Sequence, residues 1–257
     1  MFTKRITADD DQPSVSPDRP HPTQEAGWEQ PRTNSPPQDS NDVAWVSRID
    51  RQHCLSGDAY LNAKRGLDLA LVMGSMPLWL PLLAVCLGLV TLESPTTPAL
   101  FRQPRTGKGG IVFGMLKLRT MVPNAAALKK ELAHLNELRY PDFKIKNDPR
   151  ITRIGWLLRK TSLDELPQLI NVLRGEMSLV GPRPTSFLRE TYAPWHTERL
   201  DVTPGLTGLW QVYGRATLEF DDRLRLDILY IRCRCLTLDL RLIYQTVWSL
   251  LQRRGAY

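Results

Sequence analysis

Twenty-four residues without a charged side chain run through the first half of the chain: Leu69-Ala-Leu-Val-Met-Gly-Ser-Met-Pro-Leu-Trp-Leu-Pro-Leu-Leu-Ala-Val-Cys-Leu-Gly-Leu-Val-Thr-Leu92. As one continuous helix, this run would be about 36 Å long, enough to cross a bilayer. Pro77 and Pro81 interrupt it, and each favours a kink because proline lacks the N–H of a helical hydrogen bond. Basic residues flank both ends, whereas a spanning helix usually has them on one side. A spanning helix and a helix that bends at proline and returns to the same face both remain open, and the length disfavours a helix buried in a soluble core.

Charge divides the chain into two parts. Residues 1–60 contain 6 basic and 10 acidic side chains, whereas residues 61–257 contain 28 and 17. The basic balance therefore belongs to the second part, where it suits phosphate-rich partners such as nucleotides, nucleic acid or an anionic membrane surface. The four cysteines form no metal-ligand pattern and no disulfide framework, which favours a reducing compartment.

The first 60 residues are expected to lack a folded core. From Thr7 to Asp42 the chain is rich in Pro, Ser, Asp, Gln and Asn and nearly devoid of aliphatic side chains. Such a segment cannot bury enough apolar surface to offset the entropy lost on ordering. We therefore expect a disordered polar segment at 1–60, a membrane helix at 61–95 and a separate domain at 96–257.

A basic hairpin is expected after the apolar run. A turn rich in Gly, Lys and Arg, Phe101–Gly110, leads into the strand-like run Ile111–Met121, where alternation places Lys117 and Arg119 on one face. Glycine N–H groups beside a lysine can hold phosphate oxygens. No Gly-Lys-Ser/Thr precedes a helix here, so the pattern is not a P-loop. A plain basic surface hairpin explains it equally well.

An Asp-Glu pair lies in the polar patch Lys146–Gly175. A short basic helix is expected over Thr152–Arg159, and a longer one from about Asp164 to Leu173. Pro167 has no N–H and fits best in the first turn of the second helix. Asp164 and Glu165 should therefore stand at that helix N-terminus.

Acids at a helix N-terminus commonly cap the helix and complement its dipole. The same position also suits chemistry, because the dipole and the nearby Arg159 and Lys160 favour the ionised carboxylate that a nucleophile requires. Neighbouring helical residues point about 100° apart, so one carboxylate can attack while the other holds a metal ion. Spacing alone leaves capping and catalysis both open.

A proline-flanked arginine follows in Met177–Pro184. Pro182 and Pro184 stiffen the backbone around Arg183 and reduce the entropy lost when its guanidinium is presented. A fixed arginine suits bidentate phosphate binding. An ordinary surface turn would look similar.

Together these patches resemble the monotopic phosphoglycosyl transferases, bacterial sugar transferases that start the assembly of exopolysaccharides and related glycans. The resemblance extends from about Lys64 to Tyr257 and rests on several multi-residue motifs in the same order. Its strongest stretches are Lys117–Met121, Asn147–Gly155, Thr161–Leu169, Ser178–Pro184, Pro204–Gly208 and Trp210–Arg215. Because the chain has only the polar segment before Lys64, it resembles the small form without four preceding membrane helices.

The resemblance implies an α+β fold: a compact, mostly helical catalytic domain with a short β-hairpin, anchored by one re-entrant membrane helix. It implies that Asp164 is the nucleophile, that Glu165 is the ligand of an Mg²⁺ cofactor, and that Arg159, Arg183 and Asp227 belong to the active site. Lys117 and Arg119 match a basic phosphate-binding motif, without a choice between them. The family's helix break aligns with Leu80-Pro81, so Pro81 is expected to make the bend, while Ser75 and Pro77 lie one turn earlier.

The implied reaction moves a sugar-1-phosphate from a UDP-sugar to a polyprenyl phosphate such as undecaprenyl phosphate, with release of UMP and a phosphosugar-aspartate intermediate. The expected location is the cytoplasmic face of the bacterial inner membrane, with a homodimer left open. The alternative is a membrane-tethered basic module that binds anionic lipid or nucleic acid. Against nucleic acid, the tryptophans are scattered rather than interleaved with a basic stripe. Release of UMP would separate the enzyme from the binding module.

Overall fold

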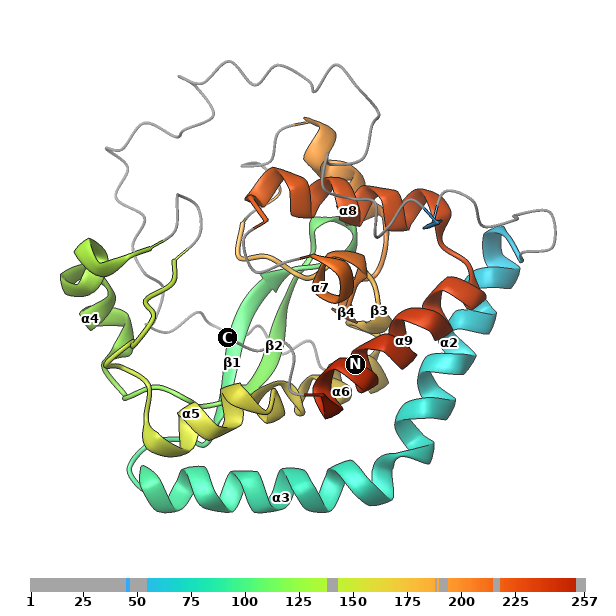
Figure 1. Ribbon diagram of the computed structural model, residues 1–257. Helices are drawn as coiled ribbons and strands as arrows, with labels where there is room; N and C mark the ends of the chain where they lie inside the picture. Colours follow the sequence, from blue (N-terminus) through green and yellow to red (C-terminus); the bar gives the residue numbers. More distant parts are fainter. Residues whose placement is uncertain are drawn as a thin grey trace, which may run out of the picture.

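A computed structural model of the protein describes residues 45–46, 55–137, 143–187, 189, 194–214 and 218–252 (Figure 1). Most of the segment predicted to be disordered, and Arg215 of the last family motif, lie outside the described residues. Helices dominate the described part, and the β-structure is confined to a hairpin and a second pair of short strands. The predicted α+β class is confirmed.

The apolar run forms two helices rather than one. Helix α2 spans Gly57–Gly74 and helix α3 spans Met76–Glu93, and Figure 1 shows a sharp bend between them. The break falls at Ser75, with Pro77 in the first turn of α3, where a missing N–H costs least. The prediction that Pro81 makes the bend is wrong, because Pro81 lies inside α3 without ending it.

Side-chain hydrogen bonds support the break between α2 and α3. The Ser75 hydroxyl donates to the Leu71 carbonyl at 2.6 Å. The indole Nε1 of Trp79 donates to the Val72 carbonyl at 2.9 Å. The Leu71 carbonyl also accepts the Ser75 N–H at 3.0 Å, so the hydroxyl adds a second bond there, and the indole gives the Val72 carbonyl a donor near the end of α2. These bonds stabilise the bend at Ser75.

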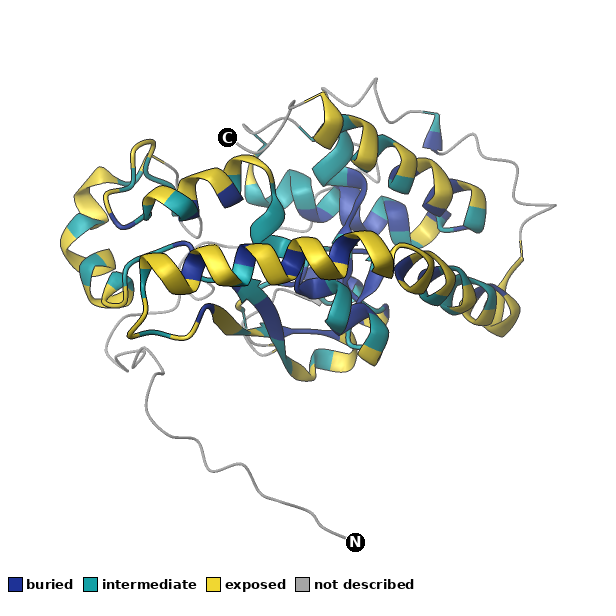
Figure 2. Ribbon diagram, turned by 90° about the horizontal axis from the view of Figure 1, so that it is seen from below, coloured by how far each residue is buried: buried dark blue, intermediate teal, exposed yellow. Residues whose placement is uncertain are grey.

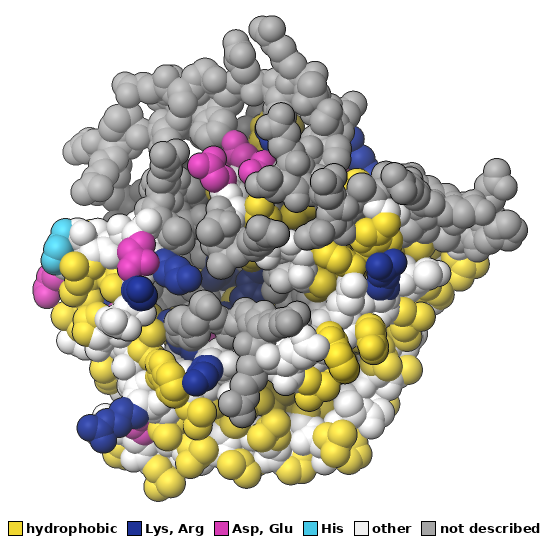
Figure 3. All heavy atoms as spheres, in the orientation of Figure 1, with side chains coloured by type: hydrophobic (Ala, Val, Ile, Leu, Met, Phe, Trp, Pro, Cys, Tyr) yellow, Lys and Arg dark blue, Asp and Glu magenta, His cyan; other side chains and the backbone are white. Residues whose placement is uncertain are grey.

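Helix α3 buries one face and exposes the other. Trp79, Leu83, Cys86 and Val90 recur at helical spacing and are buried, whereas apolar side chains on the other face are exposed (Figure 2). The exposed members include Met76, Leu78, Leu80, Leu82, Val85, Leu89 and Leu92. Figure 3 shows hydrophobic side chains along the lower edge of the molecule, where α3 runs in Figure 1. Among the described helices, α3 is the one long and apolar enough to cross a membrane.

Polar contacts fasten the first half of α2 to elements that follow α3. The Arg65 guanidinium donates to the carbonyls of Val172 and Leu173, at 2.6 and 2.8 Å. The Lys64 ammonium pairs with the buried Asp239 at 3.1 Å. The two basic residues before the apolar run are therefore used inside the protein.

The predicted basic hairpin is present. Strand β1, Leu100–Thr106, pairs antiparallel with β2, Val112–Leu118, across the short 3₁₀ turn η3, Lys108–Gly110. Gly109 and Gly110 have positive φ, which glycine adopts without strain in so tight a turn. The Gly107 and Gly110 N–H groups bond to carbonyls of the turn itself, as in a plain surface hairpin.

A second, parallel pair joins β3, Ser178–Val180, to β4, Gly205–Thr207. The two strands approach so closely at Gly181 and Gly205 that a Cβ on Gly205 would lie 2.0 Å from the Gly181 nitrogen. This contact brings the loop after β3 onto the segment before β4. The remaining elements are α4 (Ala125–Glu131), η4 (Leu132–Leu135), α5 (Arg153–Lys160), η5 (Leu163–Glu165), α6 (Gln168–Arg174), η7 (Pro194–Asp201), α7 (Leu209–Tyr213), α8 (Phe220–Cys233) and α9 (Leu236–Leu251).

Two groups of buried apolar side chains hold these elements together. One lies among α3, the hairpin, α5 and α6, and includes Trp79, Met115 and Leu158. The other lies among β3, α7, α8 and α9, and includes Leu209 and Leu238. The site described next lies where η5, β2 and the loop after β3 meet.

Candidate active site

Asp164 and Glu165 occupy the 3₁₀ turn η5 between α5 and α6. The expected single helix from Asp164 to Leu173 is wrong, because regular helix begins only at Gln168, with Pro167 as its N-cap. Ser162 precedes the turn with φ 57°, a left-handed conformation that lets the chain reverse directly after α5. Gly175 ends α6 as a glycine C-cap, with φ 81° in the same left-handed backbone conformation.

The Glu165 carboxylate is held by two cations. Lys117 Nζ donates to Oε1 at 2.9 Å. The Arg183 guanidinium reaches both carboxylate oxygens, with the Nη1–Oε2 distance at 3.3 Å and a shorter contact from Nη2 to Oε1. Burial would raise the pKa of Glu165, but the charges of Arg183 and Lys117 outweigh it and hold that pKa well below its usual range. Glu165 is therefore a fixed carboxylate.

Asp164 has a different environment from its neighbour. Among the described residues, no hydrogen bond or ion pair to its carboxylate is formed within ordinary contact distance. Burial raises the pKa of Asp164, although the charges of Lys117, Arg159 and Arg183 pull it down. Of the two basic residues expected to favour the ionised form, Arg159 does lower the pKa of Asp164, whereas the Lys160 ammonium lies over the Trp156 ring, and burial is the larger effect.

The structure separates Lys117 from Arg119. Lys117, near the end of β2, reaches Glu165, whereas Arg119 donates to the Pro98 carbonyl at 2.8 Å and lies over the Phe101 ring. Strand β2 ends at Leu118, so the alternation that would place both on one face stops between them. Arg119 is not part of the cluster.

Arg159 lies on α5 and its charge acts on Asp164 without a direct bond. Its Nε donates to the Thr120 hydroxyl at 2.9 Å, which fixes the guanidinium at the edge of the site. The cluster therefore contains the two carboxylates of η5 and three cations from α5, β2 and the loop after β3.

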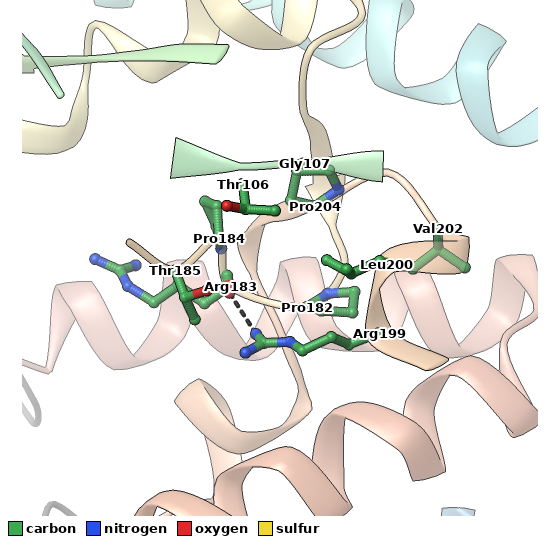
Figure 4. Close-up of a pocket in the computed structure, with 10 residues that line it drawn as sticks. All are labelled: Thr106, Gly107, Pro182, Arg183, Pro184, Thr185, Arg199, Leu200, Val202 and Pro204. Carbon is green, nitrogen blue, oxygen red and sulfur yellow. Dashed lines mark hydrogen bonds between the residues drawn. The ribbon is translucent and has the colours of Figure 1, made fainter. Parts of the chain in front are cut away.

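Asp227 is connected to the site by Arg199, a residue that was not predicted from the sequence. It is buried on α8, and its Oδ2 accepts from Arg199 Nη2 at 2.9 Å. The same nitrogen donates to the Arg183 carbonyl at 2.5 Å (Figure 4). Burial raises the pKa of Asp227 to about 7, against the opposing charges of Arg199 and Arg223. Asp227 thus supports the backbone of Arg183.

A small cavity lies beside this contact. Thr106, Pro182, Arg199 and Pro204 are among its lining residues (Figure 4). Its volume of about 10 Å³ has room for roughly one water molecule. A cavity of this size is too small to admit a nucleotide sugar. It is a packing void among the residues that hold Arg183 in place.

This arrangement suits transfer of a phosphoryl group. A half-buried carboxylate without a fixed partner stands beside cations that can receive phosphate oxygens. Comparison with known proteins agrees: the profile of the bacterial sugar transferase family matches residues 59–253. The chain belongs to that family. Membership of a transferase family argues against the alternative of a plain binding module.

Several curated members of the family are similar to this chain. The UDP-galactose-lipid carrier transferase of Erwinia amylovora is 41% identical over 199 residues, which cover 76% of this chain and 41% of that protein. The UDP-glucose:undecaprenyl-phosphate glucose-1-phosphate transferase of Caulobacter vibrioides is 43% identical over 76% of this chain and 72% of its own length. The exopolysaccharide production protein ExoY of Rhizobium meliloti is 37% identical over 76% of this chain and 88% of its own length.

The chain spans less than half the length of the E. amylovora relative. Of the site residues predicted from the sequence, the structure brings together Asp164, Glu165, Arg159, Arg183 and Lys117. Asp227 stands behind it, and Arg119 and Pro81 lie elsewhere. Arg199 could not be singled out from the sequence, because nothing in the sequence distinguishes a buried arginine from an exposed one.

Proposed function

We propose that this chain transfers a sugar-1-phosphate from a UDP-sugar to undecaprenyl phosphate, and so performs the first membrane step of exopolysaccharide or related glycan synthesis. The names of the relatives from E. amylovora, C. vibrioides and R. meliloti support the substrates and the pathway. The observation that carries the proposal is the contrast inside η5, where Glu165 is clamped by two cations and Asp164 is left without a bonded partner among the described residues.

The chemistry would be a double displacement. A carboxylate oxygen of Asp164 attacks the sugar-bearing phosphorus, the bond from that phosphorus to the bridging oxygen breaks, and UMP leaves with the electron pair. A phosphate oxygen of the carrier then attacks the same phosphorus and releases the Asp164 carboxylate. A carboxylate nucleophile thus splits one transfer between two anions into two steps. Each step needs Asp164 ionised.

The cations would supply the electrostatic part of catalysis. Lys117, Arg159 and Arg183 all act on the Asp164 carboxylate, so a diphosphate that approaches it meets the same three charges. Fixed positive charges that receive charge developing on phosphate oxygens are the main service of a protein in phosphoryl transfer. Arg199 and Asp227 would position one of them by holding the Arg183 backbone.

We also propose Glu165 as a ligand of Mg²⁺. Among the described residues, no group of three or more His, Cys, Asp or Glu side chains is placed to hold a metal ion. Two adjacent carboxylates still fit Mg²⁺, which commonly takes one or two protein carboxylates and completes its shell with substrate phosphates and water. When bound, the ion would supply further neutralisation of the diphosphate charge.

The bent helix pair would anchor the chain in the cytoplasmic membrane without crossing it. The first half of α2 is bonded to α6 and α9, which follow α3 in the chain. Both ends of the apolar run therefore belong to one folded unit, which supports a topology with both ends on one side of the membrane. A UDP-sugar donor would place that side in the cytoplasm. The exposed apolar face of α3, with the exposed apolar side chains at the end of α2, is the part that would enter the lipid.

Release of UMP tests the function. The full chain, in detergent or nanodiscs, would be given UDP-glucose, UDP-galactose or UDP-N-acetylgalactosamine with undecaprenyl phosphate. At least one donor should give UMP in proportion to the lipid-linked product. The matched Asp164→Asn variant should fold and release none, because the change is nearly isosteric and deletes the attacking charge. Full activity of a purified, non-deamidated Asp164→Asn variant would contradict the proposal.

A further inference from the structure

A second cavity, of about 230 Å³, opens among α2, the hairpin turn, β3 and the end of α8. Basic side chains from three separate parts of the chain line it: Lys64 and Arg65 from α2, Lys108 from η3, and Arg234 directly after α8. It shares no lining residue with the cluster around Asp164 and Glu165. The transferase chemistry described above makes no use of it.

Two of the four cations are already committed to the fold. Lys64 pairs with Asp239, which also accepts from the hydroxyls of Tyr60 and Tyr230 at 2.8 and 2.7 Å. Arg65 is bonded to carbonyls at the end of α6. These bonds make the α2 side of the cavity a fixed wall.

Lys108 and Arg234 are the cations left over. Neither forms an ion pair with any acidic side chain in the part of the chain that the structure describes. Lys108 is exposed at the hairpin turn, and the Arg234 guanidinium lies 5.8 Å from the centre of the Tyr60 ring. They stand on different elements, so their convergence on one cavity is a product of the fold.

Two acids also line the cavity, and neither forms an ion pair with Lys108 or Arg234 in the described part of the chain. Asp68 is buried and its Oδ1 accepts the Leu179 N–H at 3.1 Å, on the side where Lys64 stands. Asp201 is exposed and, among the described residues, pairs with neither Lys108 nor Arg234. The four basic side chains of the lining therefore outnumber its two acids, and Lys108 and Arg234 keep no ion-pair partner among the described residues.

The place of the cavity along α2 narrows the class of ligand. Lys64 lies seven residues before Leu71, a helical rise of about 10 Å. Leu71 and Met73 are exposed apolar side chains at the end of α2. On the proposed function, that end enters the bilayer, so the cavity stands near the layer of lipid headgroups.

We propose that this cavity binds a phosphate group between Lys108 and Arg234, carried either by the headgroup of a membrane lipid or by a soluble phosphate. Its place near the headgroups rests on the proposed function, whereas the cationic cavity does not. The planar guanidinium suits two-point recognition of phosphate oxygens, and the ammonium adds a mobile point charge.

Protection of Lys108 from an amine-reactive label tests the proposal. The full chain in phosphatidylcholine nanodiscs would be labelled with and without inorganic phosphate, and again in nanodiscs that contain phosphatidylglycerol. Peptide mass spectrometry would measure labelling at Lys108 and, as an internal control, at the exposed Lys130 of α4. We expect one or both phosphate sources to protect Lys108 and to leave Lys130 unchanged. The source that protects identifies the carrier of the phosphate.

The Arg234→Gln variant should need about tenfold more ligand for the same protection, because a charge-assisted hydrogen bond is lost. Lys130→Gln is the matched control and should behave as the wild type. Protection should persist in Asp164→Asn, so a failure of the transferase proposal and a failure of this one are distinguishable. Lys108 labelling that neither phosphate source changes would overturn the inference, as would equal protection in Arg234→Gln.

Discussion

Asp164 and Glu165 are neighbours in the chain, yet their surroundings move their pKa values in opposite directions. Burial raises the pKa of Asp164 above its usual range, whereas Arg183 and Lys117 hold that of Glu165 down. The carboxylate that would attack is therefore the one that titrates at the higher pH. Because only the ionised form attacks, the rate should fall as the pH falls through the raised pKa of Asp164.

Lys117 controls where that fall occurs. Its charge lowers the pKa of Asp164, so Lys117→Gln should move the acidic limb of kcat/KM to higher pH. The rate at the optimum should drop by about 10²-fold, as when one group that stabilises the transition state is removed. Arg119→Gln is the matched control, because Arg119 contacts Pro98 and Phe101 instead. An identical limb in wild type and Lys117→Gln would contradict this assignment.

The buried pair Arg199–Asp227 is expected to hold the Arg183 backbone in place without contacting the substrate, and this role can be tested. Asp227→Ala leaves Arg199 buried without its partner and should cost about 3 kcal/mol of unfolding free energy. The double variant Arg199→Met, Asp227→Leu should recover much of that stability. It should not recover UMP release, because the Arg183 carbonyl loses its donor. Urea unfolding and turnover, measured together, check this, and recovery of both would assign the pair a structural role alone.

At the scale of elements, the bend between α2 and α3 depends on Ser75 and Pro77. A continuous helix through Pro77 would cost about 3 kcal/mol, and the bonds of Ser75 and Trp79 stabilise the broken form. Single cysteines at Ser56 and Thr96, in a background without the four native cysteines, report the side of each end. Neither should react with an impermeant thiol reagent on intact cells.

Substitution at the two prolines should then differ. Ser75→Ala with Pro77→Ala should allow some molecules to straighten, and a cysteine at Ser56 should react from outside in that fraction. Pro81→Ala should leave both cysteines protected, because Pro81 does not end α3. If the cysteine at Ser56 reacts in the otherwise native chain while that at Thr96 does not, the helix crosses the membrane and the re-entrant proposal is wrong.

The local parts of this fold could be predicted from the sequence. Alternation and glycines indicated the hairpin, and Gly175 indicated the end of α6. Contacts between distant parts could not be predicted. Arg65 bonds to residues more than 100 positions away. Pro77 and Pro81 look alike in the sequence, and only the structure shows that α2 ends at Gly74, so that Pro77 falls in the first turn of α3 and Pro81 inside it.

At the scale of the whole molecule, a short apolar piece of the N-terminal segment packs on the domain. Val46 is fully buried in the group around α8 and α9, and the Arg241 guanidinium lies 3.5 Å from the centre of the Trp45 ring. Deletion of residues 1–42 should therefore preserve both stability and UMP release. Deletion of residues 1–50 should lower the unfolding free energy by about 2 kcal/mol, through lost burial and the lost cation–π contact. Equal stability of the two truncated proteins would show that this contact is unimportant.

The central claim is that Asp164 carries the phosphosugar during transfer. Intact-protein and peptide mass spectrometry of the chain, mixed with its UDP-sugar in the absence of undecaprenyl phosphate, tests it most directly. We predict a mass increase of one sugar phosphate on the peptide that contains Asp164, absent in Asp164→Asn and lost when undecaprenyl phosphate is added. Turnover without any adduct under rapid quenching, or an adduct on a different side chain, would contradict the account.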